Sequence, residues 1–287
     1  MHFVKAKGIV GTNNGMNIYR GCQHGCIYCD ARSSCYQMHH VFEDIEVKEN
    51  AIELLEAALK SRRHPCVIGT GAMTDPYMPL ERQLGFTRRS LEMIEKYGFG
   101  ATVLTKSDLI LRDLELFQRI NSKTKAVAQI TLTTLDDNLS RLIEPNVCPT
   151  SRRVEVLWEF QKAKIPTVVW FCPILPFLTD TRENILSILE ACRETDVKGI
   201  IWYGPGVTLR DGDREYFYAN LDRKFPGLKE EYIRRYGNSY ECPSPNGPEL
   251  DRLFHETCEK FGIWHDNDQI FSWLHRLEEP ELQLSFF

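Results

Sequence analysis

The sequence lacks the features that would tie the chain to a membrane or a polyanion. No apolar run is long enough to cross a bilayer, because the best candidate, residues 165–178, is interrupted by Pro166, Pro173 and Pro176. The first residues lack the apolar core of a secretory signal peptide. Acidic residues outnumber lysines and arginines by 40 to 35, so the formal net charge is −5. We therefore expect a cytoplasmic protein with no membrane partner and no global field that attracts nucleic acid.

Internal repeats and low-complexity segments are also absent, and strand-like apolar runs alternate with segments of helical periodicity. The predicted strands are 17–20, 66–69, 101–105, 126–134, 166–171 and 199–203. The predicted helices between them are 50–62, 87–97, 107–120, 151–163 and 181–195. This βα alternation predicts an α/β protein with a parallel sheet, either doubly wound or barrel-shaped. Its ligands would lie at the C-terminal ends of the strands.

The chain has ten cysteines, and a disulfide framework does not suit a cytosolic protein. Cys22, Cys26 and Cys29 follow a predicted strand with the spacing C-x3-C-x2-C. Iron–sulfur clusters are held by thiolates, so three thiolates would leave one iron of a [4Fe-4S] cluster open to a substrate or cofactor. Gly21 and Gly25 allow the backbone to wrap closely around such a cluster.

A zinc site is the alternative interpretation of these cysteines. Structural zinc sites use four ligands, commonly as two C-x2-C pairs. Cys26 and Cys29 form one pair, and Cys35 or His24 could add a ligand, but no second pair follows downstream. A non-enzymatic zinc-binding module and three unconnected buried cysteines therefore remain as alternatives to the iron–sulfur site.

The pattern C-x3-C-x-aromatic-C, with Tyr28 at the aromatic position, resembles the signature of the radical S-adenosylmethionine (SAM) superfamily. The resemblance implies an α/β fold, a partial (β/α)6 TIM-type barrel. It also implies that a [4Fe-4S] cluster reductively cleaves SAM to a 5′-deoxyadenosyl radical, which abstracts hydrogen from a substrate. An electron donor such as flavodoxin or ferredoxin would be the partner. We expect residues 1–210 to form the barrel core, with residues 211–287 as a helical C-terminal extension packed on it within one domain.

The same resemblance suggests residues that contact SAM. Tyr28 would lie near the adenine. Thr74 and Asp75, after the second predicted strand, would bind the SAM amino group through hydroxyl and carboxylate oxygens. Arg152 or Arg153, at the start of a predicted helix, would pair with the SAM carboxylate, because a planar guanidinium matches a carboxylate, and Arg152 is the preferred candidate.

Segments 74–77, 104–107, 144–153 and 240–246 resemble one branch of the superfamily, the spore photoproduct lyase-like (DNA repair photolyase-like) proteins. The lyase carries a hydrogen-donor cysteine where this chain has Ala72, and a tyrosine where it has Asp30. Since both the donor and the relay are missing, we expect an unidentified small-molecule or peptide substrate. Nucleic-acid lesion repair or modification, as in the lyase, remains the alternative.

Two further residues are predicted to be catalytic. Cys172 ends the fifth predicted strand and would donate a hydrogen atom or bind substrate if its side chain points into the barrel; otherwise it is a core cysteine. Asp180 follows the same strand and would touch substrate hydroxyls, or alternatively cap a helix.

Overall fold

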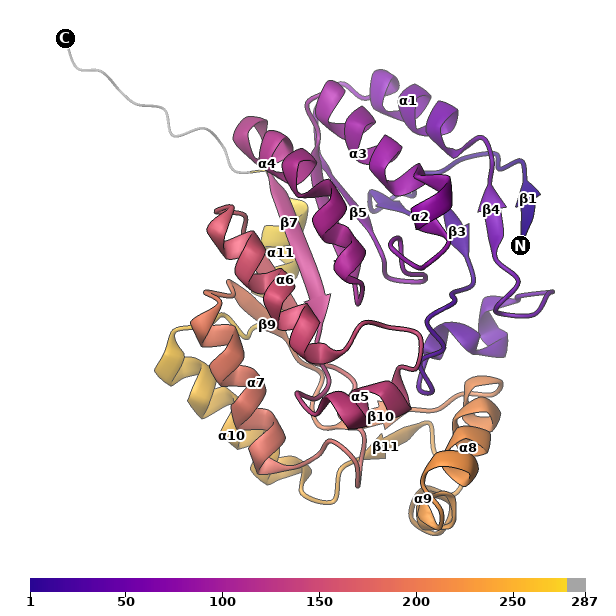
Figure 1. The fold of residues 1–287 in the computed structure, drawn as a ribbon, viewed down its shortest axis with the longest axis vertical. Helices are drawn as coiled ribbons and strands as arrows, with labels where there is room; N and C mark the ends of the chain where they lie inside the picture. The colour runs from indigo at the N-terminus through magenta and orange to yellow at the C-terminus, as the bar shows by residue number, and fades with distance from the viewer. Residues whose placement is uncertain (278–287) are drawn as a thin grey trace.

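The computed structural model describes residues 1–277, and its centre is a six-stranded sheet (Figure 1). The strands run parallel in the order β2 (Gly15–Met16), β5 (Val67–Thr70), β6 (Gly100–Thr105), β7 (Ala126–Thr131), β8 (Thr167–Trp170) and β9 (Gly199–Ile201). Strands β2 and β9 end this order and do not pair with each other. The predicted partial (β/α)6 TIM-type barrel is therefore confirmed.

Helices cover the outside of the sheet and connect its strands. They are α1 (Ala51–Ser61), α2 (Glu81–Leu84), α3 (Phe86–Lys96), the 3-10 segment η3 (Asp108–Asp113), α4 (Leu114–Lys123), α5 (Asp137–Ile143), α6 (Thr150–Lys162) and α7 (Arg182–Glu194). Helix α7 shows why they form: Ile185, Ile188, Leu189 and Cys192 repeat at helical spacing and are buried. At its start, the Thr181 side chain accepts a hydrogen bond from the Asn184 amide. The short helices α2 and α5 are missing from the sequence prediction.

The first barrel strand differs from the prediction. Residues 17–20 were expected to pair within the barrel, but Gly15 and Met16 pair with β5 instead. The next strand, β3 (Tyr19–Arg20), pairs antiparallel with β4 (Glu46–Lys48), which in turn pairs with β1 (His2–Val4). The sheet order β1–β4–β3 thus forms a separate three-stranded sheet, and β3 leads directly into the cysteines.

The C-terminal part contains four helices, which confirms the predicted helical extension, and one strand that the prediction lacks. The helices are α8 (Asp213–Lys224), α9 (Leu228–Tyr236), α10 (Gly247–Phe261) and α11 (Asn267–His275). Strand β11 (Glu241–Pro243) pairs antiparallel with β10 (Gly206–Thr208), so the predicted extension is not wholly helical. The remainder of the predicted segment, residues 278–287, lies outside the described residues, and the division at residue 210 stays a prediction. No helix within residues 1–277 is long and apolar enough to span a bilayer.

Candidate active site

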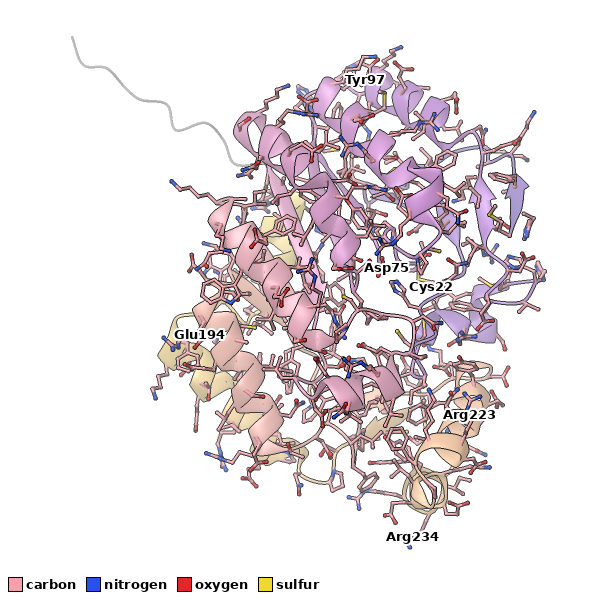
Figure 2. The ribbon with its side chains drawn as sticks, viewed as in Figure 1. Cys22, Asp75, Tyr97, Glu194, Arg223 and Arg234 are labelled. Carbon is pink, nitrogen blue, oxygen red and sulfur yellow. The ribbon has the colours of Figure 1, made fainter. Side chains whose placement is uncertain are left out.

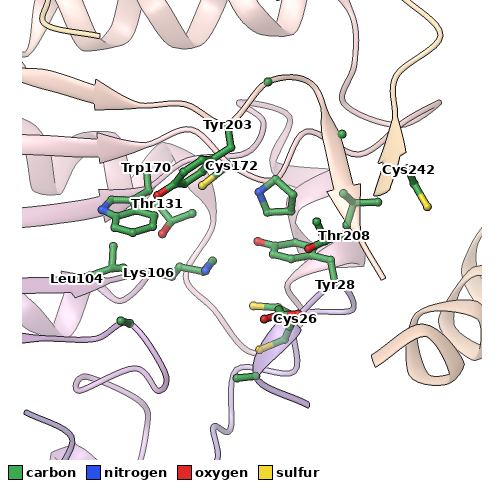
Figure 3. A pocket seen from close by; sticks show the side chains of 18 of the residues that line it. Cys26, Tyr28, Leu104, Lys106, Thr131, Trp170, Cys172, Tyr203, Thr208 and Cys242 are labelled. Carbon is green, nitrogen blue, oxygen red and sulfur yellow. The ribbon is translucent and has the colours of Figure 1, made fainter. Parts of the chain in front are cut away.

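A cavity of about 1160 Å³ opens at the C-terminal ends of the barrel strands (Figure 3). The cysteine loop forms one wall, and residues that follow β8, β9, β10 and β11 form the opposite wall. The volume exceeds the roughly 300–1,000 Å³ of pockets that hold one small ligand. The cavity therefore has room for a cofactor and a substrate together.

Cys22, Cys26 and Cys29 all line this cavity as free thiols, the first two buried and the third partly buried. A single zinc ion would hold three thiolates about 4 Å apart, given zinc–sulfur bonds of about 2.3 Å. Within residues 1–277, the groups of three potential ligands whose atoms all lie within 4.8 Å of one another do not include these cysteines. Three thiolates are the donor set that a [4Fe-4S] cluster with one open iron would take.

The loop around the cysteines is tightly tied to the barrel. Gly21 has φ +88°, and a Cβ there would lie 2.4 Å from the Phe42 carbonyl oxygen, so no other residue fits without a shift. The Ile27 amide donates to the Ile143 carbonyl at 2.9 Å, which fixes the loop to the end of α5. The fold therefore fixes the position of the loop that carries the cysteines.

Thr74 and Asp75 line the cavity, but both bind the protein itself. The Thr74 hydroxyl donates to the Gly21 carbonyl at 2.5 Å. Figure 2 places Asp75 near Cys22 at the centre of the molecule. Four groups surround the buried Asp75 carboxylate: the Tyr77 and Lys106 amides at 2.8 and 2.9 Å, the Thr105 hydroxyl at 2.6 Å and His24 Nδ1 at 3.2 Å.

These four contacts occupy the oxygens of the Asp75 carboxylate, so the side chain holds neighbouring segments in place. Burial alone would raise its pKa, but the charge of His24 and the hydrogen bonds lower the pKa of Asp75 to about 2. His24 is itself buried beside Cys22, whose charge helps to raise the pKa of His24. Asp75 and Thr74 therefore connect the end of β5 to the cysteine loop, and their contact with SAM stays a prediction.

Lys106 is the residue that sequence reasoning left out of the candidate site. It follows β6, and its ammonium points into the cavity in Figure 3, with Nζ 5.8 Å from the centre of the Tyr28 ring. Burial disfavours the charge, but Cys26, Glu144 and Cys29 raise the pKa of Lys106 to about 12. Lys106 is the only lysine or arginine among the residues that line the cavity. The sequence did offer a clue to Lys106, because it belongs to segment 104–107, one of the segments that resemble the spore photoproduct lyase-like branch.

Arg152 is not among the residues that line the cavity, and its pairing with the SAM carboxylate stays a prediction. Its side chain is 41% exposed and pairs with Asp108 at 3.1 Å and with Glu155. Successive helical residues point about 100° apart, and the next residue, Arg153, faces inward. Arg153 is 1% exposed and pairs with the buried Glu144.

The buried ion pair of Arg153 and Glu144 holds the Tyr28 side chain in place. Its ring lines the cavity, and its hydroxyl donates to Glu144. Arg153 also donates to the Thr131 carbonyl at 2.8 Å, which fixes the pair to the end of β7. A chain of buried contacts thus holds the Tyr28 ring against the cavity.

The two predicted catalytic residues lie in different surroundings. Cys172 lines the cavity, with its sulfur turned toward it in Figure 3, and burial raises its pKa to about 12. The thiol therefore keeps its proton at neutral pH. Asp180 does not line the cavity; it accepts a hydrogen bond from Ser244, which does, at 2.6 Å. The alternative role of Asp180 as a helix cap is wrong, because Thr181 caps α7.

The wall opposite the cysteines is aromatic and acidic. Trp170 donates its indole N–H to Gln129 at 2.7 Å, and its ring lies 6.4 Å from the ring of Tyr203. Tyr203 is 63% exposed. Glu241 and Asp251 carry negative charge on the same wall.

Two residues distinguish this cavity from the lyase pattern, and both line it. Ala72 stands at the position of the donor cysteine, and Asp30 at the position of the tyrosine. Asp30 instead accepts a hydrogen bond from the Tyr36 hydroxyl at 2.7 Å. The cavity therefore does contain a phenol next to Asp30, on the segment that follows the cysteines.

A partial barrel with a thiol-lined cavity at the carboxyl ends of its strands defines an α/β-barrel enzyme, because such sheets bind their ligands at that edge. The chain belongs to the radical SAM superfamily, whose family model matches residues 16–186. The family implies a [4Fe-4S] cluster and SAM as cofactors.

Similar curated proteins carry no assigned activity. An uncharacterized protein of Methanocaldococcus jannaschii is 32% identical over 174 residues, which cover 60% of this chain and 64% of the relative. An uncharacterized protein of Mycobacterium tuberculosis is 27% identical over 234 residues, which cover 77% of this chain and 66% of the relative. The chain thus spans slightly less than two thirds of the length of these relatives.

Solved structures of spore photoproduct lyase have a similar fold. One variant superposes with a TM-score of 0.66 at 14% identity, covering 92% of this chain and 80% of the lyase. Another, with bound AdoMet and dinucleoside spore photoproduct, has a TM-score of 0.61 at 15% identity and covers 86% of this chain and 74% of the lyase. At this identity the likeness extends to the fold alone.

Proposed function

We propose that the enzyme binds a [4Fe-4S] cluster on Cys22, Cys26 and Cys29 and uses it with SAM to abstract hydrogen from a small-molecule or peptide substrate. The observation that carries this proposal is the single cavity that has the three free thiols on one wall and Cys172 with aromatic residues on the other. Together, the cluster and SAM would supply a 5′-deoxyadenosyl radical there.

Within this proposal, Lys106 binds the SAM carboxylate in place of Arg152. It is the one lysine or arginine among the described residues that line the cavity. Its Nζ lies 5.8 Å from the centre of the Tyr28 ring, and the SAM adenine would lie against that ring. Thr74 and Asp75 act through the cysteine loop, since their polar atoms already bind Gly21 and His24.

Cys172 is the proposed hydrogen-atom donor or substrate contact. Its protonated thiol lines the cavity near Lys106 and Tyr203. The charge of Lys106 acts to lower the pKa of Cys172, and a charge on Cys172 would raise the pKa of Tyr203. Asp180 contributes by holding the Ser244 hydroxyl at the cavity wall. Both roles follow from the placement of these groups at the carboxyl ends of β8 and β11.

The charges of the cavity favour a neutral or cationic substrate. Asp30, Glu241 and Asp251 line it, and Lys106 would be neutralised by the SAM carboxylate. Nucleic-acid binding depends on lysines and arginines that contact phosphates, and the cavity offers few. A small molecule or a peptide therefore fits better than the lesion substrate of the lyase.

The test is anaerobic incubation of the full chain with dithionite and SAM, followed by measurement of 5′-deoxyadenosine. We expect a brown protein with about four irons per chain, a cluster signal in electron paramagnetic resonance, and 5′-deoxyadenosine that disappears in Cys26→Ala. Stoichiometric zinc without iron would establish the zinc-binding alternative and exclude the proposal. Replacing dithionite with flavodoxin or ferredoxin then tests the proposed electron donor.

A further inference from the structure

A second cluster of metal-binding side chains lies outside the cavity, in the three-stranded sheet. His2 on β1, Glu46 on β4 and His40 in the preceding loop each place one ligand-type atom within 4.8 Å of the other two. His2 and Glu46 are direct neighbours in the parallel pairing of β1 with β4. Three segments that are distant in sequence thus bring two imidazoles and one carboxylate together.

The hydrogen bonds of both histidines leave a nitrogen free for an ion. His40 Nδ1 lies 3.0 Å from the Val41 carbonyl oxygen, to which it can only donate. Its Nε2 then carries the lone pair; it is buried and has no hydrogen-bond partner among the described residues. His2 Nδ1 lies 3.0 Å from the Asp44 carboxylate; when it donates a hydrogen bond there, the lone pair of His2 lies on Nε2. Histidines that bind metals usually donate their other N–H to a carbonyl or carboxylate in this manner.

Glu46 is the third potential ligand, and its carboxylate is not paired with the neighbouring Arg20. Arg20 faces Glu46 across the β3–β4 pairing, but its guanidinium donates to the carbonyls of Tyr36 and Gln37 at 2.6 and 2.9 Å. The Glu46 side chain is 19% exposed, as is that of His40, and the two lie 3.9 Å apart, which is too far for a hydrogen bond. The carboxylate oxygen and the His40 nitrogen therefore face each other with a separation that an ion can bridge.

We propose that His2, His40 and Glu46 bind a Zn²⁺ ion. Two imidazoles and one carboxylate are a donor set that zinc favours, and they leave a fourth position for water. Zinc bonds of about 2.0–2.1 Å bring ligand atoms to about 3.3 Å of one another, so the side chains need to move inward by about 1 Å. The ion would join β1, β4 and the loop before β4, and so stabilise the sheet whose strand β3 leads to Cys22.

The test measures zinc and iron separately in the full chain. Anaerobically purified, cluster-loaded protein is equilibrated with zinc, passed through gel filtration and analysed for both elements. We expect about one zinc per chain in the wild type and in the exposed neighbour control His39→Ala. The zinc should be lost in His40→Ala and in the near-isosteric Glu46→Gln, while iron stays unchanged in all four proteins. The zinc-dependent rise in thermal midpoint should also be confined to the wild type and His39→Ala.

Two outcomes would overturn the proposal. Equal zinc in all four proteins would place the ion elsewhere, and no retained zinc in the wild type would exclude the site. Neither result bears on the radical SAM chemistry, because the iron content and 5′-deoxyadenosine report on that independently. Glu46→Gln keeps the test decisive if His40→Ala does not fold.

Discussion

Arg152 and Arg153 are neighbours in sequence with opposite environments. Arg152 holds surface carboxylates, whereas Arg153 pairs with Glu144 in the interior and thereby supports the Tyr28 hydroxyl. Surface pairs contribute little to stability, but a buried carboxylate left without its partner is costly. The two residues are therefore a matched pair for experiment.

We predict that Arg153→Met lowers the free energy of unfolding by about 3–5 kcal/mol, because the buried Glu144 carboxylate loses its ion-pair partner. Arg152→Met should change the free energy of unfolding by less than about 1 kcal/mol. Urea unfolding of the full chain measures both. Equal effects of the two substitutions would show that the ion pair of Arg153 with Glu144 does not stabilise the fold more than a surface pair does.

Lys106 tests the proposed SAM site at the same scale. Lys106→Met should weaken SAM binding by about 10- to 100-fold, as expected for loss of a hydrogen bond between charged groups worth about 1.5–3 kcal/mol. Equilibrium dialysis of SAM against the cluster-loaded protein measures the dissociation constant, and iron content should not change. Lys162→Met, on the surface, is the matched control; an unchanged affinity in Lys106→Met would remove Lys106 from the site.

At the scale of elements, the loop that carries the cysteines depends on a backbone conformation that only glycine adopts readily. Gly21→Ala should reduce the iron content and the thermal midpoint together, because a Cβ at φ +88° lies 2.4 Å from the Phe42 carbonyl oxygen. Gly8→Ala is the control, since a Cβ there meets nothing within 4 Å. Full iron loading of Gly21→Ala would mean that the loop can shift without harm to the site.

Helix α8 begins with a carboxyl group whose pKa is displaced upward. Burial raises the pKa of Asp213 from 3.8 to about 6, and its Oδ2 is buried without a hydrogen-bond partner within residues 1–277. The folded chain therefore retains a proton that the unfolded chain releases between these two pH values, so this group stabilises the fold at low pH and the contribution is lost as pH rises.

The pH dependence can be measured against Asp213→Asn, which does not titrate. The free energy of unfolding of the wild type minus that of the variant should fall as pH rises from about 4 to about 6 and stay level above that range. Urea unfolding at each pH gives the difference. A difference that is constant over the range would contradict a raised pKa.

Much of the element order could be predicted from the sequence, because apolar periodicity is local. Helix α7 and strands β6 and β7 lie within a few residues of their predicted positions. The strand at 17–20 was misplaced because two-residue strands carry no periodic signal, and β10–β11 was missed because its partners are more than 30 residues apart. Which of Arg152 and Arg153 faces inward depends on how helix α6 is rotated about its axis. The partners of Asp75 come from three separate loops. Neither feature follows from the spacing of residues along the sequence.

At the scale of the whole molecule, the net charge of −5 and the acidic cavity wall oppose binding to a polyanion. We predict no saturable binding of single- or double-stranded oligonucleotides within the range of about 1–100 µM that is typical of non-specific binders. Fluorescence anisotropy at low salt measures this most sensitively, since low salt strengthens phosphate contacts. Micromolar, salt-dependent binding would instead support the nucleic-acid alternative.

The two walls of the cavity draw differently on the chain. The cysteine wall lies within residues 16–186, the range that the family model matches, as do Trp170 and Cys172 of the opposite wall, while Tyr203, Glu241 and Asp251 of that wall lie beyond it. Mutations in the second wall can therefore accumulate without altering the thiols or their anchoring loop. A lineage could therefore change its substrate by replacing Tyr203, Glu241 and Asp251. The buried residues Phe217, Leu221 and Tyr232 of the same segment would have to be kept, because they pack in one core with Cys26, Ile27 and Tyr28.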